Sequence, residues 1–198
     1  MKQIKSLRKR TKILIAALII ALLFFALFLY CLCSLNEFQT YYLDVMKTLN
    51  GSKAKEYMLT ELNGTNNLTD ILLDWEQRRL TWANGSFTRY SDPQSILNQG
   101  KGKCEEYSIV YAAACLALGY EARLLVSRQF YLAFLGLHGF HVWTEVKLNG
   151  SWVQFDPSPT PFWNDTSHYR GSDWGPRMTL SVFAFEDGRI EDVSSRYR

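Results

Sequence analysis

The chain has few cysteines and few histidines for its length, and this scarcity excludes several kinds of site. Its 198 residues include four cysteines and three histidines, and no two cysteines form a Cys-x-x-Cys pair. The sequence therefore predicts neither a disulfide framework nor a paired-cysteine zinc site. It also lacks an Asp-rich calcium loop and a glycine-rich phosphate-binding loop, so we expect no metal and no other cofactor.

Charge of either sign is absent from a long segment near the N-terminus. Ile13 to Leu35 is an uncharged, mainly apolar run of 23 residues, long enough to cross a bilayer as a helix. Basic residues cluster before this run and none follows until Lys47, so the positive-inside rule places the N-terminus in the cytoplasm and the remaining chain outside. We predict an uncleaved signal anchor of a single-pass membrane protein. A cleaved signal peptide is the alternative, which the length of the run disfavours.

The rest of the chain lacks a basic stripe, so no nucleic acid partner is expected. Six of the 22 basic residues precede the apolar run, whereas all 19 acidic residues follow it. The later region also has a surplus of Asn-x-Ser/Thr sequences, which are acceptors for N-glycosylation outside the cytosol. They begin at Asn63, Asn67, Asn84, Asn149 and Asn164. Some of these also mark turns, which is the structural alternative.

Three short runs supply a thiol, an imidazole and a carboxylate in a fixed order. They are Gly102-Lys103-Cys104-Glu105-Glu106-Tyr107, His141-Val142-Trp143-Thr144-Glu145-Val146 and Trp152-Val153-Gln154-Phe155-Asp156-Pro157. A cysteine nucleophile needs a base that takes its proton and a carboxylate that orients the base. The candidate catalytic residues are therefore Cys104, His141 and Asp156.

The spacing of the second and third runs predicts that the histidine and the aspartate meet. Residues 141–148 alternate between apolar and polar as a half-buried strand does. Asn149-Gly150 then favours a two-residue type I′ turn, in which both residues need a positive φ. This turn pairs Trp143 with Asp156 and makes His141 and Asp156 diagonal neighbours on one face. A slip of one residue would separate them.

The thiol is predicted at the start of a helix. An apolar, alanine-rich pattern runs from Glu105 to Ala117, and Gly119 follows where a left-handed cap is typical. Cys104 then lies at or just before the helix N-terminus, where free amides and the helix dipole favour a thiolate and can bind an oxyanion. The second oxyanion donor stays open among three residues, Trp75, Trp82 and Gln99.

Each residue also has a purely structural explanation. A single cysteine is most often a small buried hydrophobic residue, and either His138 or His168 could replace His141. We prefer His141 because it alone lies in the alternating run, on the face that it shares with Asp156.

The joint pattern resembles the core of the transglutaminase-like superfamily of papain-fold thiol enzymes, and within it the peptide:N-glycanase catalytic core. The resemblance covers about residues 70–160, and the stretch after Asp156 strengthens it. It implies that Cys104 is the nucleophile, His141 the general base and acid, and Asp156 the orienting carboxylate. Unlike the glycanase, this chain lacks paired zinc-binding cysteines and carries an apolar N-terminal run.

The predicted fold class is α+β, with the nucleophile-bearing helix packed on an antiparallel sheet and preceded by a transmembrane helix. The expected parts are a basic cytoplasmic tail (1–12), a transmembrane helix (13–35), a helical stalk (36–66) and a catalytic domain (67–198). The expected function is a membrane-anchored cysteine amidohydrolase that forms an acyl-enzyme with protein, peptide or glycosylamide substrates. The alternatives are an acyl-transferring cross-linker and an inactive binding module.

Overall fold

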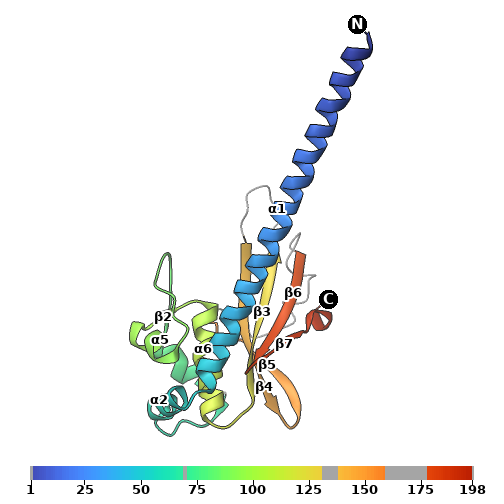
Figure 1. Ribbon diagram of the computed structural model, residues 1–198. Coiled ribbons are helices and arrows are strands. Elements are labelled where there is room, and N and C mark those ends of the chain that lie inside the picture. The colour runs from blue at the N-terminus through green and yellow to red at the C-terminus, as the bar shows by residue number, and fades with distance from the viewer. Residues whose placement is uncertain (1, 69–70, 131–137, 159–177, 198) are drawn as a thin grey trace. The chain divides into compact units, whose positions relative to one another are not determined.

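The computed structural model describes residues 2–68, 71–130, 138–158 and 178–197 (Figure 1). The chain forms two compact units, Met1–Tyr41 and Tyr42–Arg198. Helix α1 (Lys2–Asn50) passes through both. His168, the alternative to His141, and Asn164, a predicted glycosylation acceptor, lie outside the described residues.

The first unit is helical and strongly apolar. Among the described residues, one helical segment is long and apolar enough to cross a membrane: Ala17–Asn50, whose most apolar 18-residue window has a mean hydropathy of 2.8. The apolar run from Ile13 to Leu35 lies within α1, as a membrane span requires. Insertion in a membrane and its orientation stay predictions.

The second unit begins with the last turns of α1. Buried side chains recur there at helical spacing, at Tyr42, Val45, Met46 and Leu49. Helix α2 (Ser52–Leu62) follows and buries Met58 and Leu62. Residues 42–66 of the predicted stalk (36–66) therefore lie in the same compact unit as residues 67–198.

The apolar spacing predicts a helix from residue 68 to 82, but in the structure the helix ends at Arg79. A π-helical turn, η1 (Ile71–Trp75), leads into α4 (Glu76–Arg79), and Leu80 is extended. Strand β1 (Thr81–Trp82) then pairs in parallel with β2 (Lys101–Gly102). The helical prediction is wrong beyond Arg79, because pairing with a distant segment overrides local periodicity.

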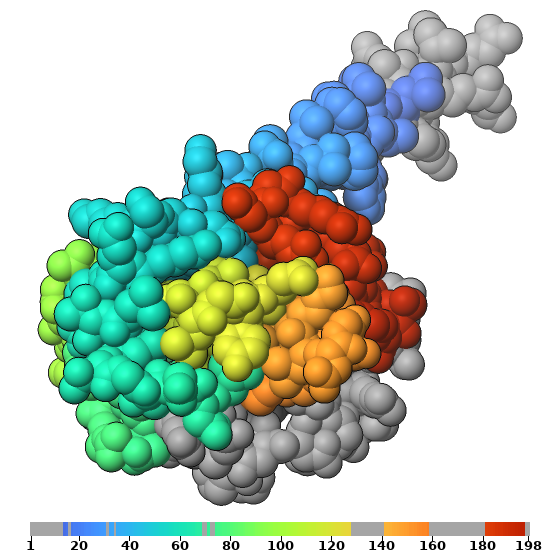
Figure 2. All heavy atoms as spheres, turned by 90° about the horizontal axis from the view of Figure 1, so that it is seen from below, coloured from blue at the N-terminus to red at the C-terminus, as the bar shows by residue number. Residues whose placement is uncertain are grey.

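Five strands form the main sheet, and neighbouring strands are antiparallel throughout. The order is β5-β4-β3-β6-β7, so the hairpin β4–β5 occupies one side and β6–β7 the other. Figure 2 shows the corresponding yellow, orange and red segments next to one another. The strands are β3 (Ala122–Phe130), β4 (His138–Leu148), β5 (Ser151–Phe155), β6 (Met178–Glu186) and β7 (Arg189–Asp192). A short 3-10 helix, η3 (Ser194–Tyr197), follows.

Helices α2, α5 (Pro93–Gln99) and α6 (Cys104–Ala117) lie together beside the sheet (Figure 1). Asp92 caps α5 by accepting a hydrogen bond from the Ser95 amide at 2.8 Å. Helix α6 is buried along almost its whole length, and its Tyr111 ring lies 5.6 Å from that of Phe155 in β5. The architecture is α+β, as predicted.

The hairpin register agrees with the prediction from Asn149-Gly150. Asn149 and Gly150 have φ angles of 51° and 81°, the positive values that a type I′ turn needs. Leu148 pairs with Ser151, and the ladder continues to Thr144 and Phe155. One further step along both strands places Trp143 of β4 opposite Asp156, the residue that follows β5.

We expect Gly150→Ala to lower the free energy of unfolding by about 1–2 kcal/mol, because a side chain disfavours positive φ. No heavy atom lies within 4 Å of the Cβ position, so steric crowding does not add to this cost. Thermal unfolding of the full chain, produced without glycosylation, would measure the loss. Ser151→Ala is the control, and equal stability of the two variants would contradict a turn-determined register.

Candidate active site

Cys104 is the first residue of α6 and its side chain is half-buried. The turn before it is fixed by Glu106, whose carboxylate accepts a hydrogen bond from the backbone nitrogen of Lys103 at 2.9 Å. Gly102 packs against the same residue: a Cβ at Gly102 would lie 2.5 Å from the Cβ of Glu106. Glycine is therefore required for this close approach, which sets the path of the chain into the nucleophile helix.

His141 and Asp156 are in direct contact. The Nε2 atom of His141 lies 2.8 Å from Oδ2 of Asp156, and both residues are largely buried. The second carboxylate oxygen, Oδ1, accepts a hydrogen bond from the backbone nitrogen of Ser158 at 2.9 Å. Asp156 is thus held from two directions, and its orientation fixes that of the imidazole.

Cys104 meets the same imidazole. Burial lowers the pKa of His141, but hydrogen bonds to Asp156 and Cys104, together with their charges, raise it to about 10. Because Nε2 faces Asp156, Nδ1 is the nitrogen left for the thiol. The structure brings the three predicted residues together, and the raised pKa favours the protonated form of the His141 imidazole.

The three candidates for a second oxyanion donor differ in their surroundings. The indole nitrogen of Trp75 donates to the carbonyl of Glu61 at 3.2 Å. The amide nitrogen of Gln99 contacts two backbone carbonyls, of Thr88 and Lys101, at 2.9 and 3.1 Å. Trp82 is 38% exposed and pairs in β1 with Gly102, two residues before Cys104. The identity of the second oxyanion donor among these three residues stays a prediction.

Sequence reasoning missed Glu76, a buried carboxyl behind the site. Its side chain is fully buried, and neither oxygen has a hydrogen-bond partner among the described residues. Burial, and then the negative charge of Asp156, hold the pKa of Glu76 well above its usual value, which favours the protonated, neutral form of this carboxyl. A signal was present, since Glu76 follows the apolar spacing of Leu68, Ile71, Leu72 and Trp75.

Arg123 joins the histidine strand to the C-terminal strands. Its guanidinium is 2% exposed and donates to Glu145 of β4 at 2.8 Å, with further contacts to Glu186 and Glu191 at 3.0 and 2.8 Å. The ring of Trp152 in β5 lies 4.0 Å from it, and Arg196 contacts Glu145 from η3. Several partners thus offset the cost of burying this charge.

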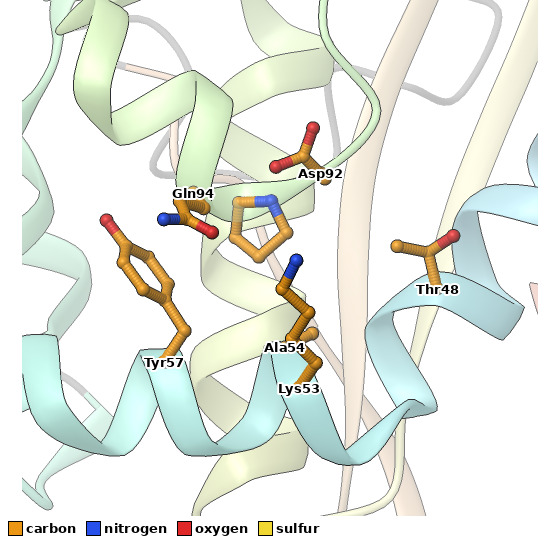
Figure 3. Close-up of a pocket in the computed structure, with 7 residues that line it drawn as sticks. Thr48, Lys53, Ala54, Tyr57, Asp92 and Gln94 are labelled. Carbon is orange, nitrogen blue, oxygen red and sulfur yellow. The ribbon is translucent and has the colours of Figure 1, made fainter.

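A cavity of about 160 Å³ lies between α2, the end of α1 and the start of α5. Figure 3 shows the Lys53 side chain extending from α2 toward the start of α5, which Asp92 precedes. The lining residues are Thr48, Lys53, Ala54, Tyr57, Asp92, Pro93 and Gln94, so Cys104, His141 and Asp156 are not among them.

Four of the five predicted acceptor asparagines are described, and all four are exposed: Asn63, Asn67, Asn84 and Asn149. Asn63 and Asn149 have positive φ angles, which agrees with their alternative role in turns. Their modification stays a prediction.

A half-buried cysteine at a helix N-terminus beside a buried His–Asp pair is an arrangement typical of thiol enzymes. Residues 40–157 match the family described as Transglutaminase-like superfamily. This is more than half of the chain, and the chain belongs to this superfamily.

Curated relatives share the site region. The chain is 34% identical over 110 residues to a peptide-N(4)-(N-acetyl-beta-glucosaminyl)asparagine amidase of Oryza sativa subsp. japonica, over 54% of this chain and 22% of that protein. It is 32% identical over 113 residues to the Drosophila melanogaster protein of the same name, over 56% and 16% of the two chains. The chain thus spans about a fifth of the length of these relatives.

Two solved structures, from Cytophaga hutchinsonii and Parabacteroides distasonis, also align with this chain. They cover 74% and 78% of it, and 53% and 30% of their own chains, with TM-scores of 0.45 and 0.47 and sequence identities of 16% and 13%.

The raised pKa of His141 predicts a pH dependence of stability. The unfolded imidazole loses its proton near 6.5, whereas the folded one retains it to about 10. The stabilisation is therefore fully present below pH 6.5 and is lost as the pH rises toward 10. Denaturant unfolding of the full chain at a series of pH values should show this decline and should lack it in His141→Gln. Parallel pH curves for the two proteins would contradict the charged pair.

Proposed function

We propose that the chain is a thiol amidohydrolase in which Cys104 is the nucleophile, His141 the acid and base, and Asp156 the orienting carboxylate. The observation that carries the proposal is the continuous contact from Cys104 through His141 to Asp156. Cys115 offers no comparable site, since it is fully buried and burial raises the pKa of its thiol.

The reaction follows from this arrangement. The Cys104 thiolate attacks the amide carbonyl carbon, and the oxyanion accepts hydrogen bonds from free amides at the start of α6. The tetrahedral intermediate collapses as the carbon–nitrogen bond breaks and imidazolium His141 gives its proton to the leaving nitrogen. A thioester remains on Cys104. Neutral His141 then takes a proton from water, whose oxygen attacks the thioester and releases the acid and the thiolate.

The proposed substrate is a protein, peptide or glycopeptide amide. The names of the relatives in rice and the fruit fly specify a glycosylated asparagine amide, which makes the glycosylamide bond the sharper proposal. An external location would expose the site to glycoproteins. The partners of the chain are then a glycopeptide substrate and the membrane.

Two alternatives use the same residues. If an amine reaches the thioester before water does, the chain is an acyl-transferring cross-linker. If the site does not turn over, the chain is a transglutaminase-like binding module, which the assembled Cys–His–Asp contacts make less favourable.

Replacing the three site residues should separate their roles. We expect Cys104→Ala to abolish amide cleavage, since no other group forms the thioester. Asp156→Asn should retain the fold and slow turnover by at least about a hundredfold, because an amide stabilises the imidazolium poorly. Mass analysis of glycopeptides and synthetic amides, with and without an added amine, would separate hydrolysis from transfer.

The matched control is Cys115→Ala, which lies on the same helix about 16 Å along its axis from Cys104 at 1.5 Å per residue. It should retain turnover, and circular dichroism would verify the fold of each variant. Full activity in Cys104→Ala would refute the thiol mechanism.

We further propose that residues 13–35 anchor the chain, with residues 1–12 in the cytoplasm and the unit from Tyr42 onward outside. An epitope tag at the C-terminus should then bind antibody on intact cells, whereas a tag at the N-terminus should bind only after permeabilisation. The reverse pattern would invert the orientation that the basic cluster predicts.

A further inference from the structure

Ser108 is a buried hydroxyl one turn after Cys104 on α6. It is fully inaccessible to solvent. Its Oγ lies 2.7 Å from the carbonyl oxygen of Cys104 and 2.9 Å from the carbonyl oxygen of Val142 in β4. The first contact is the usual bond of a helical serine to the preceding turn. The second crosses to another element, at the residue next to His141.

Thr144 makes a return contact from the strand to the helix. Its Oγ1 donates a hydrogen bond to the carbonyl oxygen of Ser108 at 3.2 Å, and its side chain is also fully buried. Two hydroxyls, one from α6 and one from β4, therefore donate in opposite directions across the same contact. The acceptor in β4, the carbonyl of Val142, adjoins His141, and the acceptor in α6, the carbonyl of Ser108, lies one turn after Cys104.

The end of β4 that carries His141 has little support from β5. The β4–β5 ladder ends where Thr144 pairs with Phe155, so His141 lies three positions beyond the last pair. Strand alternation also directs His141 and Thr144 to opposite faces of β4, yet α6 contacts both residues. The helix therefore meets β4 at the edge that β5 leaves open.

Apolar side chains surround this contact, since Tyr107, Ile109, Val110 and Tyr111 of α6 are buried. Hydrophobic contacts have no preferred direction, however. Hydrogen bonds between buried groups do have a direction and a fixed length, and they are costly to break in a dry interior. The Ser108 and Thr144 hydroxyls are therefore the groups that can hold the helix and the strand at one offset.

We propose that Ser108 and Thr144 are positioning residues, which together hold Cys104 within hydrogen-bonding distance of His141. The proposal rests on the thiol mechanism above and extends it to two residues that do not touch the substrate.

The test is the pH dependence of Cys104 alkylation by iodoacetamide in the full chain purified in detergent, with the Cys104 peptide followed by mass spectrometry. In the wild type, pairing with His141 should keep Cys104 reactive below pH 7. Ser108→Ala and Thr144→Val should each lower the rate at pH 6 by about tenfold, since small displacements of paired groups have large kinetic effects. Ser108→Thr, which keeps a hydroxyl, should restore the rate.

The control is Ser194→Ala. This serine is also buried, and its hydroxyl accepts a hydrogen bond from the backbone nitrogen of Val182 at 2.9 Å, but it joins η3 to β6. Ser194→Ala also removes a hydroxyl from the interior, so a general loss of stability would slow alkylation in this variant too. We expect its alkylation rate at pH 6 to stay within about twofold of the wild type.

Three outcomes decide the proposal. Slow alkylation of Cys104 in both Ser108→Ala and Thr144→Val, with a wild-type rate in Ser194→Ala, supports it. Wild-type rates and an unchanged pH midpoint in folded Ser108→Ala or Thr144→Val overturn it and leave the thiol mechanism standing. If alkylation of Cys104 in the wild type follows the pH dependence of an ordinary thiol, the thiol mechanism itself is overturned, and the positioning role of Ser108 and Thr144 with it.

Discussion

Two consecutive residues with positive φ, Asn149 at 51° and Gly150 at 81°, determine where the reactive side chains lie. They fix a two-residue turn, and the turn fixes the register of β4 against β5. Because side chains alternate along a strand, a slip of one residue would turn every side chain to the other face. The contact between His141 and Asp156 depends on this register, and so does the position of Trp152 beside Arg123.

Buried charged groups lie at both ends of the β4–β5 hairpin, and each is compensated in a different way. Arg123 is compensated by Glu145 and two further carboxylates, which link β3, β4, β6 and β7. At the site, Asp156 is compensated by His141 and a backbone amide. Glu76 has no side-chain hydrogen bond among the described residues, and burial raises its pKa, which favours the neutral form and avoids the cost of a buried charge.

The nucleophile helix depends on contacts at its first turn. The amide of Lys103 donates to Glu106, and the same side chain leaves room only for glycine at position 102. The parallel pairing of β1 with β2 brings Trp82 beside this turn. The turn before α6 therefore positions the thiol at the helix N-terminus, next to the strand that carries Trp82.

The sequence by itself determined the local features: the hairpin turn, its register and the start of a helix near Cys104. Each depends on backbone preferences of a few neighbouring residues, which act in any surroundings. Only the tertiary structure decided that β1 replaces a helix at Thr81, that Glu76 is buried behind Asp156, and that Ser108 meets β4. These depend on partners 20 or more residues away in the chain, such as Gly102 for Trp82 and Val142 for Ser108. Local periodicity carries no information on which distant groups will share an interior, so packing and burial decided them.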